Sequence, residues 1–456
     1  MKKLCALIAV LSLMPFAYAH ADGSQITASG NYRLQYQDMQ NSAGDKSADS
    51  SNFHQRFRLG VNARPNERFN AHVTLVGNDD WGAPQYADSA MTELNANTQN
   101  NLNNSLLVNE AYASWVINDS WMMRFGRGAF TMGDGRLISK NKWENVETAF
   151  DGVVLSWDQD WGRTSFFAVK GAVGYTPGTI LPASVNPNLT SRFYGVSEDL
   201  KNLPTFLKMV NIHLLEVYQD QAEYQLYPNV INGAPALNET RAGLAVSGDK
   251  MNVDYRVDYE METGKYTEYS AVVANPKQNL STHMIDADLG YTMPSLMSGR
   301  VHIGYHQDSG NGSATDLDGT YNGFAYNRHA NGGLMGIFGW GNLTYTWFGV
   351  SAQPRDDINV AVNYYMFSKT NSSGVVNPGD FGNSFSTDGG VSTVNGTLGN
   401  ELDLRVTKKY GHNFFVAARY GMFSAGSGYN GVNASGTTNS LHTTVSEYYL
   451  AGCLKF

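Results

Sequence analysis

The sequence predicts an all-β chain that forms a single transmembrane, antiparallel, up-and-down β-barrel of about 18 strands. Three observations support this prediction: apolar and polar residues alternate with a period of two, the composition is poor in charge, and the chain ends on an amphipathic segment with a terminal Phe. Only 16% of the residues are charged, against roughly 25% in a typical soluble domain. Aromatic residues make up 12%, and Gly occurs 47 times. Such a composition suits a sheet with one face toward lipid and the other toward water.

The N-terminus has the features of a secretory signal peptide. Lys2 and Lys3 form a positive start, and the apolar run after them is shorter than the roughly 20 residues that a membrane-spanning helix needs. We therefore expect cleavage after Ala21, which divides the chain into a signal peptide at 1–21 and a barrel at 22–456. Cleavage changes the formal charge from −9 to −11, because it removes two Lys and no acidic residue.

The alternation itself is the strongest local signal. In residues 251–262 every second side chain is apolar, and the others are polar or charged; residues 26–37 and 53–64 follow the same pattern. A helix would mix the two faces. The segments run about ten to twelve residues, which fits a tilted membrane strand. Aromatic residues at their ends predict interfacial girdles: Trp115, Trp121, Trp143, Trp157, Trp161, Tyr364 and Tyr365.

The connections between these segments alternate in length, which is typical of outer-membrane barrels with short periplasmic turns and long external loops. About seventeen strands are clear, residues 175–236 must hold at least one more, and closure favours an even number. We therefore expect 18 strands, with 16 as the alternative, and a short helix within 196–209. The short turns are expected at 64–67, 118–120 and 410–413, and the long loops near 79–105, 309–333, 370–397 and 425–443.

The last segment places Tyr448, Leu450, Gly452, Leu454 and Phe456 on one face. Outer-membrane barrels resemble one another in ending on an amphipathic strand with a terminal aromatic residue, which the barrel-assembly machinery reads. This segment therefore predicts a partnership with that machinery and a location in the outer membrane.

A barrel of this size is too wide for side chains to fill, so its interior is wet, plugged or both. The inward-facing residues are therefore the candidate functional residues. Arg stays charged and offers a fork of donors to carboxylates, and rings of charge steer ions in pores. The Arg residues assigned to the lumen or solute path are Arg33, Arg56, Arg58, Arg124, Arg127, Arg136, Arg256, Arg405 and Arg419.

Carboxylates face the same lumen. They are Glu110, Asp254, Asp258, Glu260, Glu401 and Asp403. Two interpretations are open: basic and acidic walls set up a transverse field that selects polar solutes, or the charges pair with neighbours and hold the wall together.

No catalytic motif, phosphate loop or Cys pair is present. His213 and Glu216 lack a second His for a metal site. Asp308, Asp316 and Asp318 lie in a Gly-rich and Asn-rich loop, but their spacing does not match a regular calcium loop. We therefore expect no enzyme, no cofactor and no metal. The acidic balance excludes nucleic acid as a partner, because such proteins carry a basic footprint.

Several motifs resemble the alginate-export family of outer-membrane barrels. The most specific are residues 123–127 (MRFGR), 133–138 (GDGRLI) and 150–153 (FDGV), in that order, with 57–61 (FRLGV) before them and 398–404 (LGNELDL) near the end. This resemblance implies an 18-stranded monomeric barrel whose Arg-lined conduit passes an anionic polysaccharide outward. It assigns that role to Arg58, Arg127 and Arg136.

The function predicted from all of these features is a passive outer-membrane channel for hydrophilic, anionic solutes or polysaccharide. Its partners would be outer-membrane lipid and the transported polysaccharide or small solute. The alternatives are a general or substrate-specific uptake porin for small solutes, and a receptor, adhesin or barrel hydrolase that acts through its loops.

Overall fold

A computed structural model of the 456-residue chain describes residues 25–40, 50–81, 106–140, 143, 147–171, 191–219, 237–267, 277–310, 320–321, 328–374, 376, 396–426, 431–432, 438–439 and 444–456. The signal peptide predicted for residues 1–21 lies outside these ranges. The strands are β1 (Gln25–Gln40), β2 (Ser50–Asn66), β3 (Phe69–Trp81), β4 (Leu106–Val116), β5 (Trp121–Gly128), β6 (Phe150–Asp158), β7 (Gly162–Gly171), β8 (Ser191–Leu200), β9 (Leu207–Gln219), β10 (Leu237–Lys250), β11 (Val253–Thr267), β12 (Lys277–Met293), β13 (Gly299–Asp308), β14 (Leu343–Arg355), β15 (Ile358–Lys369), β16 (Thr397–Tyr410), β17 (Phe414–Ala425), β18 (Gly431–Val432), β19 (Thr438–Asn439) and β20 (Thr444–Lys455), and one short helix, α2, covers Arg328–Asn331.

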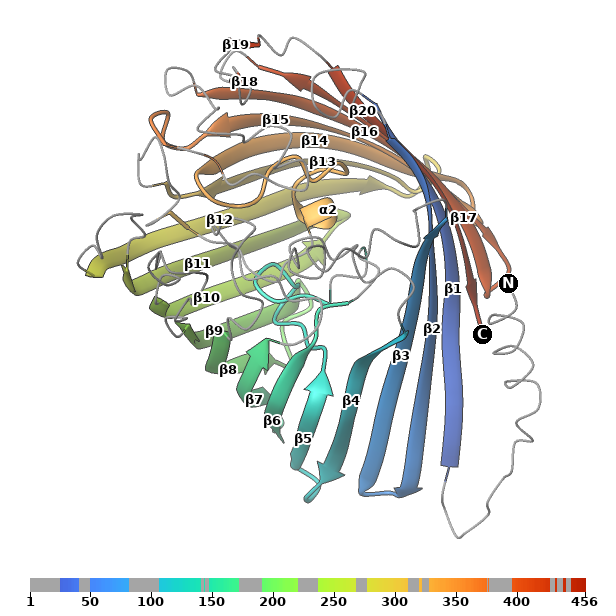
Figure 1. Cartoon of the computed structure of the whole chain (residues 1–456), viewed down its shortest axis with the longest axis vertical. Helices are drawn as coiled ribbons and strands as arrows, with labels where there is room; N and C mark the ends of the chain where they lie inside the picture. Colours follow the sequence, from blue (N-terminus) through green and yellow to red (C-terminus); the bar gives the residue numbers. More distant parts are fainter. Residues whose placement is uncertain are drawn as a thin grey trace, which may run out of the picture.

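Eighteen of these strands form one closed antiparallel ring (Figure 1). Each strand from β1 to β16 pairs with the next one in the chain, and β20 pairs with both β17 and β1. Strands β18 and β19 form a separate two-stranded hairpin. Closure satisfies the backbone groups of every strand, as a membrane-spanning sheet requires. The predicted up-and-down barrel and its 18 strands are confirmed.

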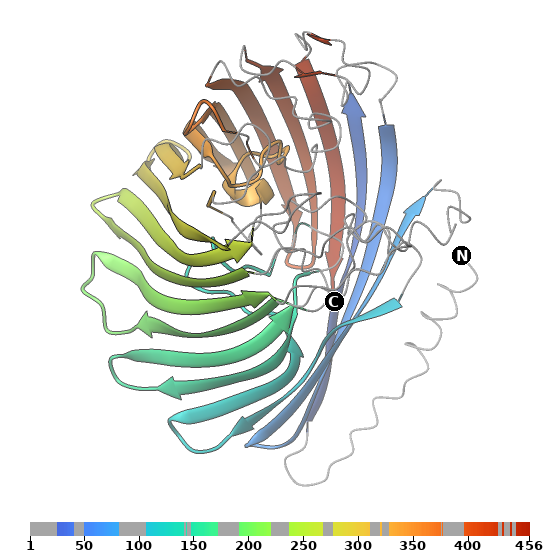
Figure 2. The ribbon, with the colours of Figure 1, turned by 60° about the vertical axis from the view of Figure 1, so that its left-hand side comes forward.

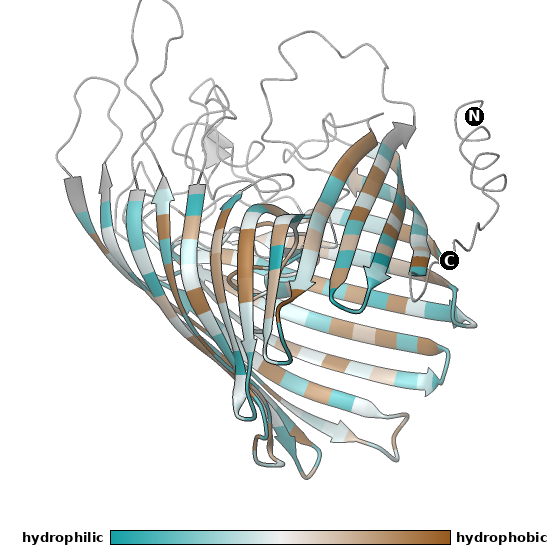
Figure 3. Cartoon of the chain, turned by 90° about the horizontal axis from the view of Figure 1, so that it is seen from below, coloured by the Kyte–Doolittle hydropathy of each residue, from teal (hydrophilic) through white to brown (hydrophobic). Residues whose placement is uncertain are grey.

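The two faces of the sheet follow the predicted period of two (Figure 3). On β11, Val257, Tyr259 and Met261 are more than 40% exposed on the outer face, whereas Asp258 and Glu260 are buried on the inner face. The same alternation recurs on the other long strands, so an apolar band surrounds the barrel. Near one end of this band, aromatic rings stack across strands, with Trp121 on Trp157 at 5.2 Å between ring centroids.

Connections at one end of the barrel are short and those at the other end are long. The short turns hold two to six residues, and several lie along one edge of the ribbon in Figure 2. The long connections hold nine to 34 residues, which identifies their end as the external one. The helix expected within 196–209 is wrong. These residues form the end of β8, a turn at 201–206 and the start of β9, because Asn202, with a positive φ of 51°, and Pro204 favour a turn.

The C-terminal residue completes the seam of the ring. The backbone N–H of Gly30 donates to the carbonyl of Phe456 at 2.9 Å, and the N–H of Phe456 donates back to Gly30 at 3.1 Å. The Phe456 ring stacks on Phe57 with 6.0 Å between centroids and stays half exposed on the outer face. The terminal aromatic residue is therefore part of the closure between the first and last strands.

Two of the long connections fold into the barrel. The first, the 129–149 segment between β5 and β6, packs Met132, Leu137 and Ile138 against inward side chains of the neighbouring wall, such as Phe193 and Leu215. The second, the 328–342 segment, contains α2, which lies within the ring of strands (Figure 1). Its side chains pack on the inner face of β14 to β17, as described below. Within the described part of the chain, no helix is long and apolar enough to cross a membrane.

Candidate functional site

The 129–149 segment turns inward at a Gly-rich tip. Gly133 and Gly135 both have positive φ (53° and 88°), which glycine adopts without strain. The backbone at Gly133 approaches the wall formed by β9 and β10, where a Cβ atom would lie 3.2 Å from Ala245 and 3.4 Å from Asn211. The segment therefore leaves the wall at β5 and reaches strands on another side of the ring.

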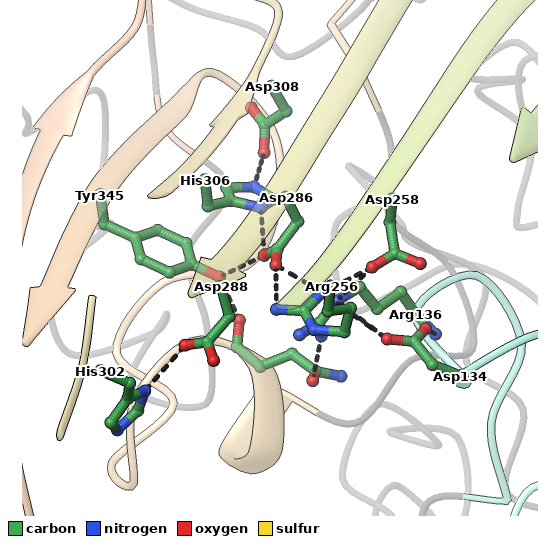
Figure 4. Close-up of polar contacts among 11 residues, drawn as sticks. Asp134, Arg136, Arg256, Asp258, Asp286, Asp288, His302, His306, Asp308 and Tyr345 are labelled. Carbon is green, nitrogen blue, oxygen red and sulfur yellow. Dashed lines mark hydrogen bonds and ion pairs between the residues drawn. The ribbon is translucent and has the colours of Figure 1, made fainter. Parts of the chain in front are cut away.

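Next to this tip, two arginines and three carboxylates form the central charge cluster (Figure 4). Arg136 lies 3.2 Å from both Asp258 and Asp286, and 3.3 Å from Asp134. Arg256 reaches Asp258 at 2.5 Å, Asp286 at 2.6 Å and Asp134 at 3.6 Å. The cluster joins the tip of the 129–149 segment to β11 and β12, and its five side chains carry one more negative than positive charge.

His306 extends this cluster to β13. Its ring nitrogens lie 3.0 Å from Asp286 and 3.1 Å from Asp308. The imidazole is fully buried between two aromatic rings, with 4.5 Å to Trp340 and 4.6 Å to Tyr345 between centroids. Figure 4 shows the line from Asp308 through His306 to Asp286.

Asp308 in turn anchors the 328–342 segment where it enters β14. Its carboxylate accepts hydrogen bonds from the backbone N–H of Gly341 at 2.9 Å and of Leu343 at 2.6 Å. Asp308, which the sequence predicts to lie in a solvated surface loop, is therefore used inside the barrel. Asp316 and Asp318 lie outside the described residues.

The two in-folded segments meet inside the barrel. Arg136 donates a hydrogen bond to the side-chain oxygen of Asn331, and the Tyr345 hydroxyl donates to the Asn331 carbonyl. Beside them, the rings of Trp143 and His329 stack with 4.2 Å between centroids. Because these contacts join segments that start from different parts of the wall, the structure narrows the barrel here. We refer to this region as the constriction.

Three arginines from the wall converge on the stacked pair of Trp143 and His329. The guanidinium of Arg419 lies 4.7 Å from the centre of its ring, and Arg33 donates to its carbonyl at 2.8 Å. Arg405, the cross-strand partner of Arg419, donates to the carbonyl of His329 at 3.4 Å. Arg405 also lies 3.6 Å from Asp403. This basic side of the constriction is formed by β1, β16 and β17.

A second basic group lies on β2 and β5. Arg58 contacts Glu147 and lies 3.4 Å from Glu110. The Glu110 carboxylate accepts a hydrogen bond from the backbone N–H of Ala129 at 3.0 Å. Arg124 donates to the backbone carbonyl of Ala129 at 3.2 Å. These contacts hold the base of the 129–149 segment. Arg56, the cross-strand partner of Arg33, is also buried on the inner face.

Other predicted carboxylates face inward, but they bind groups of the protein itself. Glu401 and Asp403 are fully buried, and they accept from the backbone N–H groups of Met335 and Leu334, both at 2.9 Å. They therefore anchor the 328–342 segment. Glu260 lies 2.7 Å from His213, the histidine that lacks a second His for a metal site. The described residues contain no group of His, Cys, Asp and Glu side chains arranged to hold a metal ion.

Pairing also accounts for Asp254, the remaining predicted carboxylate. It lies 2.5 Å from Arg300, which also contacts Asp288 at 2.5 Å.

A buried tyrosine lies in the connection between β13 and β14. Tyr321 is fully buried, with its ring 5.6 Å from the Arg241 guanidinium. Burial raises the pKa of the Tyr321 hydroxyl well above its usual value, so this hydroxyl stays neutral.

The lumen assignment of Arg127 does not fit the structure. Arg127 shares the outer face with Phe125, which is 42% exposed, and it pairs with Asp151 at 2.7 Å. The two-residue period explains this position, because Arg124 and Arg127 are three residues apart and must point to opposite faces.

Two residues assigned to the aromatic girdle also lie elsewhere. Trp143 is part of the constriction, and Tyr365 is buried on the inner face of β15, where its ring stacks on Phe367. Sequence reasoning missed Asn331 and His306 as site residues. The period of two places His306 on the inner face together with His302 and Asp308. The inward position of His306 can therefore be predicted from the sequence. The position of Asn331 depends on how its loop folds, and no local pattern indicates it.

The closed ring, its apolar outer band and its polar, constricted interior define an outer-membrane channel of the porin type. Comparison with known proteins identifies the family. The chain belongs to the alginate export family, whose model matches residues 24–440. The resemblance seen in the motifs is confirmed, and the protein lies in the outer membrane. No curated protein sequence matches the chain.

Solved structures share the fold at low sequence identity. The crystal structure of Acinetobacter baumannii OccAB1 is 12% identical, with a TM-score of 0.61 over 94% of this chain and 96% of that one. For Pseudomonas aeruginosa OccD3 (OpdP), the identity is 11% and the TM-score 0.58, over 94% and 91% of the two chains. For P. aeruginosa OccK1 (OpdK), the values are 9% and 0.58, over 95% and 98%.

Proposed function

We propose that this channel passively conducts hydrophilic, anionic solutes, and that carboxylated sugars are its main substrate class. The observation that carries this proposal is the convergence of Arg33, Arg405 and Arg419 on the stacked pair of Trp143 and His329 at the constriction. Guanidinium groups bind carboxylates through paired donors.

The opposite side of the constriction supports selection by a transverse field. There, in the central charge cluster, three carboxylates outnumber the two arginines, Arg136 and Arg256, so this side is the more negative one. A solute with a carboxylate on one edge and hydroxyl groups on the other would orient between the two sides. Rings of charge select ions in other pores in the same way. No step in this transport requires a cofactor or a covalent intermediate.

The size of the solute separates two versions of the proposal. The family supports outward passage of an anionic polysaccharide. The contacts of Arg136 with Asn331 and of Trp143 with His329 favour small solutes, because they join two segments inside the barrel and leave less room for a polymer.

Reversal potentials across planar bilayers test the charge preference. We expect the reconstituted protein to prefer chloride over potassium, and the preference to fall when Arg33, Arg405 and Arg419 are all replaced by Gln. Arg127→Gln is the matched control, because it removes the same charge from the outer face. A cation preference in the unaltered protein, or no conductance together with ligand binding or hydrolysis at the loops, would contradict the proposal.

Liposome swelling then separates the two solute sizes. Entry of glucuronate but not of an oligouronate supports the small-solute channel, and entry of both supports a polysaccharide conduit. Glucosamine, a cation of similar size, is the control for charge, and we expect it to enter more slowly than glucuronate.

A further inference from the structure

A buried histidine links the wall of the barrel to the in-folded 328–342 segment (Figure 4). His306 of β13 is fully buried, and its two ring nitrogens lie 3.0 Å from Asp286 and 3.1 Å from Asp308. Its ring is stacked between Trp340, which belongs to the segment, and Tyr345 of β14, with 4.5 and 4.6 Å between centroids. The imidazole therefore contacts both a carboxylate that anchors the segment and an aromatic ring of the segment itself.

The other partners of the two carboxylates indicate which form of this ring fits the site. The backbone N–H groups of Gly341 and Leu343 donate to different oxygens of Asp308, at 2.9 and 2.6 Å. Both arginines of the central charge cluster contact Asp286, at 2.6 and 3.2 Å. These donors stabilise the ionised form of both carboxylates, which accepts hydrogen bonds and has none to donate. Only the imidazolium has an N–H on each ring nitrogen, so only the protonated ring satisfies both carboxylates.

The charges around His306 also favour the protonated ring. The titratable groups near it are Asp134 and Arg136 in the 129–149 segment, Arg256 and Asp258 on β11, Asp286 on β12, Asp308 on β13, Tyr345 on β14, and Tyr321 in the connection between β13 and β14. With His306 protonated, the three cations of this group face four carboxylates. Loss of its proton leaves two cations for the same four carboxylates, and buried charges are costly unless they are paired.

We propose that His306 is a pH-sensitive latch, which holds the 328–342 segment inside the barrel and releases it at alkaline pH. A cation within about 6 Å of the centre of an aromatic ring is attracted to the ring face, so the imidazolium binds Trp340 as well as Asp308. As the pH rises through the titration of His306, the ring loses its charge and one N–H, and a lone pair then faces one of the two carboxylates. The attraction for Trp340 and one hydrogen bond are lost, which weakens the docking of the segment.

Release of this segment would widen the channel. His329 and Asn331 belong to it, and they meet Trp143 and Arg136 at the constriction. Their departure would remove one of the two segments that narrow the barrel there. The latch therefore regulates the size of the constriction, and this inference rests on the channel function proposed above.

Single-channel recordings in symmetrical salt at pH values from about 6 to about 10 test the latch. We expect the unaltered protein to spend about tenfold more time at a larger conductance level at the alkaline end, since a desolvated cation–π contact contributes roughly that factor. His306→Gln has no titrating ring, so its recordings should not change with pH over this range. His302→Gln is the matched control, because His302 also faces inward from β13, and its partners Asp288 and Asn363 lie on wall strands. This control should follow the unaltered protein.

A second measurement does not depend on the folding of a variant. With the histidine rings labelled, NMR spectra of the unaltered barrel in detergent micelles should show one histidine whose titration midpoint equals the midpoint of the conductance change. The proposal is overturned if conductance does not change with pH, if His306→Gln keeps the pH response, if His302→Gln loses it, or if no histidine titrates at that midpoint. Ion preference is measured separately through reversal potentials, so failure of the latch can be distinguished from failure of the proposed anion selectivity.

Discussion

The side chain of Arg419 offers the most direct test of how the constriction selects ions. It faces inward from β17, with its guanidinium 4.7 Å from the centre of the Trp143 ring. Within the described part of the chain it contacts no carboxylate. Replacing it with Gln therefore removes one positive charge without leaving a carboxylate unpaired, and Gln keeps a polar side chain at the site.

The size of the effect follows from Coulomb's law. An ion that passes about 8 Å from the guanidinium through water interacts with it by about 0.5 kcal/mol. Losing this charge disfavours the anion and favours the cation by the same amount, so the chloride-to-potassium permeability ratio should fall about fivefold before screening. With a Debye length of about 30 Å at 0.01 M salt, the expected fall is about fourfold, and with about 10 Å at 0.1 M it is about twofold.

Reversal potentials in a tenfold salt gradient, measured at a low and a high mean concentration, give this ratio. Arg127→Gln is the control, because Arg127 lies on the outer face beside Phe125 and should change the ratio little. The reasoning is refuted if Arg419→Gln leaves the ratio unchanged at low salt, or if both variants change it equally.

Further predictions concern the constriction, its anchors and the rim. Trp143→Ala removes the ring at which the basic side converges, and single-channel conductance should rise about twofold; an unchanged value would place the narrowest point elsewhere. Asp308→Asn removes the charged acceptor of two backbone N–H groups and should lower the free energy of unfolding by about 2 kcal/mol in a denaturant titration; no loss would mean that the 328–342 segment is held by its apolar packing alone. Phe456→Ala should reduce the fraction of folded barrel in outer-membrane preparations, detected as heat-modifiable migration in gels, and full assembly would argue against recognition of the terminal ring. A hydrogen bond from Lys408 lowers the pKa of Asp357 below 3.8. The stabilisation from this pair should therefore be complete above about pH 4 and be lost as the pH falls through the lowered pKa; a carboxyl titration by NMR with a midpoint at or above 3.8 would contradict this.

Much of the barrel could be predicted from local sequence. A strand with one face in lipid and one in water must alternate, so the inner positions of Arg33, Arg58 and Arg256 follow from counting by two. The same count places Arg127 on the outer face, and the motif resemblance pointed to the wrong side. In 196–209, where we expect a helix, residues 201–206 form a turn between two strands.

The in-folded segments could not be predicted in this way. Arg136 and Asn331 are 195 residues apart and lie in connections without periodicity. Trp143 has the composition of a girdle residue, and only the path of its segment places it beside Arg419. Packing of Ile138 against the inner wall decides that path, and such packing depends on strands distant in sequence.

The sequence by itself therefore determined the membrane-spanning sheet, its number of strands and the side of the sheet that most charges occupy. The reason is that lipid and water impose opposite demands on neighbouring residues, and these demands are visible at a separation of one residue. Only the tertiary structure decided which charges are neutralised and which remain for a solute. That outcome depends on distances of about 3 Å between groups on different strands and loops, because the strength of a charge pair falls with separation and with exposure to water.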